Sequence, residues 1–369
     1  MNESFDFSDA YGTITYYKHK LLRRCCMPKV FVGMSGGVDS SSAALMLREQ
    51  GYDVEGVTLR LKPGSLADED IRDAAAAADS ADIKLHVLDL RELFREKVIG
   101  YFTSEYLRGA TPNPCVICNR EIKFGAMLDY ALKNGADYVA TGHYASLERR
   151  DGQTLLRRSA SSKDQSYFLC MLSQFQLSHA LFPLDGMEKS EIREFARARG
   201  LSAASKKDSQ EVCFIPDNDY SGFIRSQGLS DMGEGDFVDI NGSVIGRHKG
   251  IMNYTVGQRK GLGAFGRPMF VTRLDIGRNR VVLGEEGAQY SDGFFAGDIN
   301  WISGEIPKNG FRVQVKIRFR APAAWATVTP EDKGLDVKFD EPQRSVTPGQ
   351  FAAFYDGDTV LGGGHISLK

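Results

Sequence analysis

The chain has 369 residues, 42% of them hydrophobic and 25% charged, which exceeds one average domain and excludes a mainly disordered protein. Lys and Arg total 46 against 48 Asp and Glu, so the formal net charge of −2 excludes a uniformly basic surface, and any basic surface must be local. No apolar run reaches the ~18 residues of a membrane span. Six cysteines without a secretion signal favour a reducing compartment, so we expect a cytoplasmic protein with no membrane partner.

Residues 1–28 show no clear periodicity, and we expect a disordered extension there. Met27 is followed by Pro28, Lys29 and a strand-like run, and we expect Met27 to be the natural start of the protein.

Residues 29 to about 145 alternate short apolar runs with helical patterns. The patterns predict strands at 30–34, 54–59, 84–90 and 138–142, and helices at 38–50, 68–80, 92–107 and 121–133. This order implies a parallel sheet covered on both faces. Its ligand crevice should lie beyond the carboxyl ends of the strands.

After residue 145 the pattern changes. Residues 145–156 read as a hairpin with Asp151-Gly152 at the turn, and helical pieces follow at 165–172 and 189–199. From about residue 230 onward glycine is frequent and Asn-Gly, Asp-Gly and Pro-Gly turns recur. This pattern predicts a small β-rich domain followed by a β-barrel.

The sharpest motif is a Ser-Gly-Gly turn between a strand and a helix, at residues 30–42. Gly36 and Gly37 let the backbone N–H groups approach an anion, and Ser35, Ser40 and Ser41 can donate hydroxyl hydrogen bonds to phosphate oxygens. Because Asp39 would repel phosphate, it is a candidate Mg²⁺ ligand. No Lys follows the glycines as in a Walker loop, and the motif resembles the loop of the PP-loop ATP pyrophosphatases.

Two cysteine segments form a second constellation. Cys115 and Cys118 stand in a loop entering a helix, and we expect that helix end, Arg120 and Lys123 to depress the pKa of Cys118. Polar residues precede Cys213 and apolar residues follow it, and this pattern predicts a strand edge that lines a cleft. On its own the Cys-x-x-Cys pattern leaves a redox pair, metal ligands and packing open.

Taken together, the phosphate loop and the cysteine segments resemble the tRNA-specific 2-thiouridylase family (MnmA/TrmU) from about Lys29 to the C-terminus. Four further segments carry the resemblance: 140–144, 163–168, 254–263 and 347–350. It implies a PP-loop catalytic domain (29–217), a small central β-rich domain (218–288) and a C-terminal RNA-binding β-barrel (289–369). It also implies ATP-dependent 2-thiolation of the wobble uridine of tRNA, with AMP and pyrophosphate released.

The resemblance also assigns roles to single residues. The ATP site comprises Gly33, Met34, Ser35, Gly36, Gly37, Val38, Asp39, Ser40, Leu59 and Gly142. Cys213 matches the cysteine that carries a persulfide and Cys118 its nucleophilic partner. The segment that touches the target base is Asn113, Pro114 and Cys115. The tRNA-contacting positions are His143, Lys163, Asp164, Gln165, Arg318, Phe319 and Gln350. A sulfur-relay protein or cysteine desulfurase is the implied persulfide donor.

One departure from the family bears on the chemistry. Many members carry Asp where this chain has Cys115, so Cys115, Cys118 and Cys213 give three thiols, enough for a [4Fe–4S] cluster with one open iron. Two mechanisms stay open at this point: persulfide delivery from Cys213 resolved by Cys118 as a disulfide, or attack by a cluster-bound sulfide.

Two stretches supply the local positive charge that the net charge hides. Residues 240–274 contain six cations and no acid, and residues 312–320 alternate, with Arg312, Lys316, Arg318 and Arg320 on one predicted strand face. We expect these stretches to contact the tRNA backbone.

A competing interpretation keeps the ATP loop and changes the acceptor, giving an amidotransferase-type synthetase that acts on a small molecule. A second one makes the cysteines a structural zinc site in an RNA-binding module, and it leaves the ATP loop unexplained.

Overall fold

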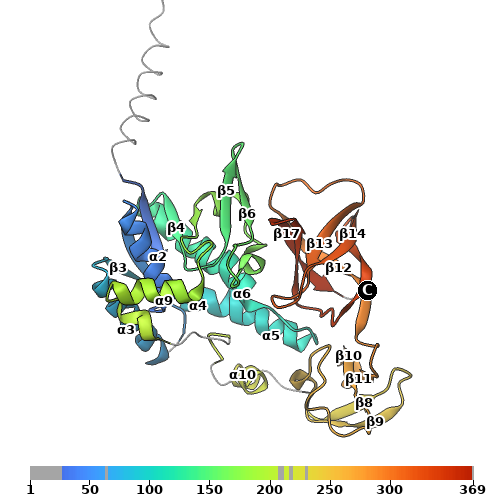
Figure 1. The fold of residues 1–369 in the computed structure, drawn as a ribbon. Helices are drawn as coiled ribbons and strands as arrows, with labels where there is room; N and C mark the ends of the chain where they lie inside the picture. The colour runs from blue at the N-terminus through green and yellow to red at the C-terminus, as the bar shows by residue number, and fades with distance from the viewer. Residues whose placement is uncertain (1–26, 63–64, 207–211, 216–218, 229–231, 368–369) are drawn as a thin grey trace, which may run out of the picture.

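The computed structural model describes residues 27–62, 65–206, 212–215, 219–228 and 232–367. The predicted disordered extension lies outside the described residues, apart from Met27 and Pro28. The described chain forms a layered α/β part, a four-stranded sheet and a β-barrel (Figure 1). No helix within the described ranges is long and apolar enough to cross a membrane.

A five-stranded parallel sheet forms the first part, with strand order β3-β2-β1-β4-β7. Its strands are β1 (Lys29–Gly33), β2 (Asp53–Arg60), β3 (Leu85–Asp89), β4 (Tyr138–Ala140) and β7 (Ala180–Leu181). In β1 the side chains alternate between two cores, because Val30 and Val32 pack on one face and Phe31 on the other.

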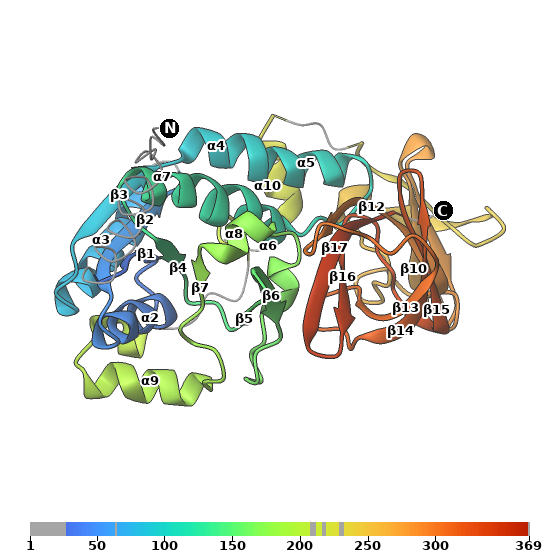
Figure 2. The ribbon, with the colours of Figure 1, turned by 90° about the horizontal axis from the view of Figure 1, so that it is seen from above.

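Helices cover both faces of this sheet, as the βα alternation predicts (Figure 2). The core around Val30 and Val32 includes side chains of α2 (Val38–Glu49), α3 (Ser65–Ser80) and α9 (Lys189–Ala198). The core around Phe31 is built with two longer helical rods. One comprises α4 (Arg91–Phe94), the π-helical η1 (Arg95–Ile99) and α5 (Gly100–Leu107), and the other comprises α6 (Pro114–Ile117), the π-helical η2 (Cys118–Ala126) and α7 (Met127–Lys133).

The second rod begins earlier than the sequence predicts. A start at Glu121 is wrong, because the helix begins at Pro114, whose fixed φ and missing N–H suit the first helical position. Cys118 therefore lies a full turn inside the rod and not at its N-terminus.

The predicted hairpin at 145–156 is confirmed as β5 (Ser146–Arg150) and β6 (Gln153–Arg157). Asp151 and Gly152 both have positive φ at its turn. The following segment is mostly short pieces: η3 (Ser166–Leu169), α8 (Gln174–Ser178), η4 (Ser202–Ser205) and α10 (Tyr220–Ser226). The helix predicted at 165–172 is a single 3₁₀ turn.

The central part is a four-stranded sheet of order β10-β11-β8-β9, with 3₁₀ turns η5 (Ile251–Asn253) and η6 (Ile276–Arg278). Its strands are β8 (Gly235–Val238), β9 (Val244–His248), β10 (Phe270–Asp275) and β11 (Arg280–Gly284). Gly109, which follows α5, lies so close to this sheet that a Cβ there would be 2.7 Å from the Ile276 side chain.

Six antiparallel strands close the C-terminal barrel, because β12 pairs with both β15 and β17. They are β12 (Tyr290–Trp301), β13 (Phe311–Lys316), β14 (Ala324–Glu331), β15 (Gly334–Arg344), β16 (Phe351–Asp356) and β17 (Thr359–Ser367). Strand β6 pairs with β17, so the β5–β6 hairpin joins the barrel to the first part. The predicted fold class, a parallel-sheet part followed by a small β-rich part and a β-barrel, is confirmed.

Candidate active site

The predicted phosphate loop connects β1 to α2. The backbone N–H of Ser35 donates to Ser40 Oγ over 3.2 Å, and the hydroxyls of Ser40 and Ser41 donate to the Gly37 carbonyl over 3.1 and 2.9 Å. These bonds fix the turn and place the N-terminal end of α2 at the carboxyl edge of the sheet. A helix N-terminus at this edge favours a bound anion.

Two glycines allow the backbone to pass where a side chain would not fit. Gly36 has φ +70°, and a Cβ there would be 2.6 Å from the Asp73 backbone in α3. Gly142, just beyond β4, would place a Cβ 2.9 Å from the Asp39 backbone. The structure therefore brings Gly33 to Ser40 and Gly142 together, and Leu59 is the penultimate residue of β2 at the same edge.

The Asp39 side chain is held by residues that the sequence interpretation missed. Lys189 Nζ donates to Asp39 Oδ1 and Oδ2 over 2.8 and 2.7 Å, and the Tyr144 hydroxyl donates to Oδ1 over 2.8 Å. Lys189 is remote in sequence and no motif marks it. Mg²⁺ is usually bound by one or two carboxylates together with substrate phosphates, so the Asp39 carboxylate is a suitable type of ligand for this ion.

The cysteine segments lie near one another. Cys115 and Cys213 are exposed and Cys118 is partly buried, and each thiol is close enough to another of the three to influence its titration. The charges of Lys62, which follows β2, and Asp70 in α3 also act on Cys213. Cys213 therefore lies beside the edge of the sheet that carries the phosphate loop.

Cys213 stands on a turn, and the expected strand edge is wrong. The Ile215 N–H donates to the Val212 carbonyl over 2.9 Å, and Ile215 is buried. The Phe214 ring packs edge-on against Phe94 and Phe102. The apolar residues Phe214 and Ile215, which suggested a strand, instead pack into the protein and hold Cys213 next to the α4–α5 rod.

The expected depressed pKa of Cys118 is also wrong. Burial raises the pKa of Cys118 to about 12, and the cation of Lys123 offsets only part of this effect. Arg120 is engaged elsewhere, because its guanidinium pairs with Glu121 over 2.7 Å and Asp298 over 3.2 Å. Cys115 and Cys213 are exposed as residues, but protein atoms surround their thiol groups, and this desolvation raises the pKa of Cys115 to about 11 and that of Cys213 above its usual range.

The three thiols do not form a metal site in this arrangement. Among the residues that the structure describes, no group of three or more His, Cys, Asp or Glu side chains could hold a metal ion. The positions of the three thiols therefore do not fit the [4Fe–4S] cluster that the sequence left open.

The segment predicted to contact the target base is docked onto both β-rich parts. Thr111 donates its N–H to the Pro348 carbonyl and accepts from Gln350 Nε2 at its own carbonyl, both over 2.8 Å. Its hydroxyl donates to Thr255 of the central part over 3.3 Å. Asn113 and Pro114 follow at once and cap the rod that carries Cys115 and Cys118.

Most of the predicted tRNA-contacting side chains also make contacts within the protein. Asp164 accepts from the Ser166 N–H, Gln165 accepts from the Tyr144 N–H, and the Phe319 ring packs at a tilt against Phe168, with ring centroids 4.5 Å apart. Lys163 is exposed, whereas His143 is buried and bonded to Thr141. Burial holds the pKa of His143 well below its usual value, so its imidazole is neutral. The tRNA roles of these residues stay predictions.

The predicted basic strand at 312–320 is shorter than expected, because β13 ends at Lys316. Arg312 pairs with Asp340 of β15, across the intervening strand β14, which neutralises part of the face. Arg318 lies past the strand end and donates to the Thr347 hydroxyl and the Val256 carbonyl, so it joins the barrel to the central part.

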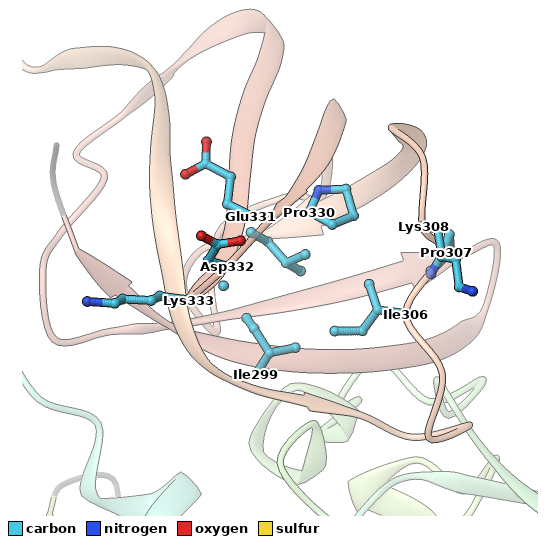
Figure 3. Close-up of a pocket in the computed structure, with 10 residues that line it drawn as sticks. Ile299, Ile306, Pro307, Lys308, Pro330, Glu331, Asp332 and Lys333 are labelled. Carbon is cyan, nitrogen blue, oxygen red and sulfur yellow. The ribbon is translucent and has the colours of Figure 1, made fainter.

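A pocket of about 460 Å³ lies on the barrel, next to the β14–β15 turn (Figure 3). Apolar side chains such as Ile299 and Ile306 line it with the charged Glu331, Asp332 and Lys333. None of its lining residues belongs to the predicted site.

The chain matches three family models along its length. Residues 28–217 match the tRNA methyl transferase HUP domain, residues 222–285 the tRNA methyl transferase PRC-barrel domain, and residues 291–366 the aminomethyltransferase beta-barrel domain. Among solved structures, a 4-thiouridine synthetase–RNA complex with bound ATP has a TM-score of 0.37 at 21% identity, over 54% of this chain and 50% of that one.

Curated relatives are far more similar. The tRNA-specific 2-thiouridylase MnmA of Clostridium acetobutylicum is 46% identical over 351 residues, which covers 92% of this chain and 99% of the relative. The protein of the same name from Acetivibrio thermocellus is 48% identical over 354 residues, which covers 92% of this chain and 99% of the relative. At this identity and coverage, the chain belongs to the family of the tRNA-specific 2-thiouridylases MnmA.

Proposed function

We propose that this protein is an ATP-dependent tRNA uridine 2-sulfurtransferase acting on the wobble uridine. The observation that carries the proposal is the meeting of Cys213 with the Cys115–Cys118 rod beside the sheet edge that holds the phosphate loop. Thiols and a nucleotide loop are the two parts that this reaction requires, and the chain's family makes 2-thiouridine its product.

ATP activates the C2 oxygen of uracil, which is otherwise a poor leaving group. Residues 33–40 bind the phosphates, with Leu59 and Gly142 near the adenosine. Bound Mg²⁺ would neutralise phosphate charge beside Asp39. The uridine O2 attacks the α-phosphorus, pyrophosphate leaves, and the oxygen becomes part of AMP.

Sulfur then arrives from Cys213. Its persulfide terminal sulfur adds to C2, AMP departs with the oxygen, and a disulfide joins Cys213 to the base. The Cys118 thiolate attacks Cys213 Sγ, so the bond to the transferred sulfur breaks and that sulfur stays on C2. The resulting Cys118–Cys213 disulfide needs an external thiol reductant before the next cycle.

The persulfide route is favoured over the cluster route, because the described thiols do not form a metal-binding group. A sulfur-relay protein or cysteine desulfurase would load Cys213, which is exposed to such a partner. Anaerobic purification tests this choice: iron-free protein should be fully active, and activity that follows iron content would contradict it.

The tRNA is expected to lie across the exposed surface near Lys163 and the central part. Within the described residues, Lys249, Arg259, Lys260 and Arg273 make no ion pair, whereas Arg247 pairs with Asp236 and Arg267 with Glu285. Unpaired cations favour phosphate contacts. The target uridine must leave the anticodon stack, at a cost of a few kcal/mol that these contacts offset.

The function is tested by incubating the persulfide-loaded protein with ATP and tRNA, followed by mass spectrometry of the nucleosides and measurement of pyrophosphate. We expect 2-thiouridine and pyrophosphate in equal amounts, both dependent on tRNA. The competing synthetase predicts release that depends on a small molecule. Release without tRNA would therefore contradict the proposal.

A further inference from the structure

We infer that Lys189 is the cation that binds the departing pyrophosphate, a role that the glycine loop leaves unfilled. The inference rests on the proposed function and adds a residue to its nucleotide site. Residues 33–40 contain no Lys or Arg, so the loop itself offers phosphate only N–H groups, hydroxyls and a helix end. A departing pyrophosphate carries more negative charge than these partial charges balance.

Lys189 is positioned at the loop by a remote helix. It is the first residue of α9, and its ammonium reaches Asp39 at the start of α2, two residues after Gly37. The Lys189 side chain is only 16% exposed, and that of Asp39 is 31% exposed. A flexible stem and three rotatable donors let the ammonium turn from Asp39 to a phosphate oxygen.

The location is unfavourable for a purely structural lysine. Helix N-termini carry partial positive charge, and Lys189 lies at the start of one helix and beside the start of another. The two nearby acids in the sequence make other hydrogen bonds. Glu188 accepts from the Ser162 N–H and hydroxyl, and Glu191 accepts from the Glu188 N–H. Two helix N-termini and an ammonium therefore meet at this point, and all three would stabilise an anion bound there.

A structural clamp between the same two helices exists at their other ends. Arg199, at the end of α9, donates to both carboxylate oxygens of Glu49, the last residue of α2, over 2.6 and 2.9 Å. This pair joins α2 and α9 away from the loop. It therefore offers a control that separates helix clamping from anion binding.

The experiment measures the binding of inorganic pyrophosphate, ATP and AMP by calorimetry without divalent metal. For Lys189→Gln we expect at least about tenfold weaker binding of pyrophosphate and ATP, because a charge-assisted hydrogen bond is lost. AMP binding should be unchanged. The matched variant Arg199→Gln should bind all three ligands like the wild type. Pyrophosphate affinity unchanged in folded Lys189→Gln protein would overturn the inference.

A second variant keeps the test decisive if Lys189→Gln does not fold. Asp39→Asn is nearly isosteric and releases the ammonium, so we expect tighter pyrophosphate binding. Loss of the Asp39 charge by itself also predicts a gain, so the double variant Asp39→Asn/Lys189→Gln is compared with Asp39→Asn. At least about tenfold weaker pyrophosphate binding in the double variant is expected, and equal binding in the two would overturn the inference. If the wild type releases pyrophosphate with tRNA while neither variant shifts the affinity, the inference fails and the proposed function stands. A wild type that neither binds nor releases pyrophosphate overturns both.

Discussion

The phosphate loop and the sulfur site are built in opposite ways. The loop is continuous in sequence, and its own hydroxyls and carbonyls hold it, as the bonds of Ser40 and Ser41 to Gly37 show. The thiols come from remote segments, and the barrel and the aromatic contacts of Phe214 position them. Adenylation of the base should therefore continue in variants that cannot transfer sulfur. Variants that cannot bind ATP, by contrast, should lose both adenylation and sulfur transfer.

The largest expected effect separates these two regions. Cys213→Ser should abolish 2-thiouridine formation, because a hydroxyl cannot carry a persulfide, while tRNA-dependent pyrophosphate release continues. Nucleoside mass spectrometry and a pyrophosphate assay measure the two outcomes. Cys170→Ala is the control: Cys170 is buried and lies outside the proposed site, so this variant should retain thiolation. Loss of pyrophosphate release in Cys213→Ser would show that the regions are not separable.

A change in the loop should stop both steps. Gly36→Ala requires a Cβ at φ +70° within 2.6 Å of the Asp73 backbone, so we expect ATP binding to be lost and unfolding to become easier by more than about 2 kcal/mol. Gly51 has φ +88° with nothing within 4 Å of a Cβ, so Gly51→Ala isolates the backbone strain. Its expected cost is about 1 kcal/mol with normal ATP binding. Equal behaviour of the two variants in calorimetry would refute the close approach at Gly36.

The pH profiles of the two regions should differ. Burial raises the pKa of Cys118 to about 12, so the neutral thiol dominates at pH 7 and the thiolate fraction grows about tenfold per pH unit. The single-turnover rate of thiouridine release from Cys213 should therefore rise by about a hundredfold over roughly two pH units around neutrality. Pyrophosphate release should change less. A rate of thiouridine release that does not change across this pH range would indicate that the pKa of Cys118 is depressed and would contradict the prediction.

The smallest expected effect concerns docking of the cysteine rod on the barrel. Gly349 has φ +90°, and a Cβ there would be 2.8 Å from Thr111 N, so Gly349→Ala should shift the base-contacting segment. If that segment contacts the target base as proposed, thiolation should fall by about tenfold, equivalent to ~1.4 kcal/mol, with unchanged ATP affinity. Gly357→Ala, at φ +55° with no neighbour within 4 Å, is the control. A fall in ATP affinity would mean that docking also supports the loop.

Local pattern was enough to predict the loop and the parallel sheet. The strand, the glycines and the helix are adjacent in sequence, and the alternation of β1 side chains between two buried cores follows directly from the strand period. The same holds for the β5–β6 hairpin, whose Asp-Gly turn favours positive φ.

Tertiary packing decided what the sequence did not. Helical periodicity could not reveal that the rod starts at Pro114, and an Arg120 next to Cys118 in sequence gave no sign that Asp298 engages it. The Cys118 pKa depends on burial between parts of the chain, and Lys189 reaches Asp39 only because α9 lies beside α2.

The central claim is that a sulfur atom on Cys213 reaches an ATP-activated uridine in one crevice. It is tested most directly with protein whose Cys213 persulfide carries a heavy sulfur isotope, mixed with tRNA in a single turnover. The account predicts the isotope in 2-thiouridine, with one AMP per labelled base and none without ATP. Unlabelled 2-thiouridine, or label transferred without ATP, would contradict it.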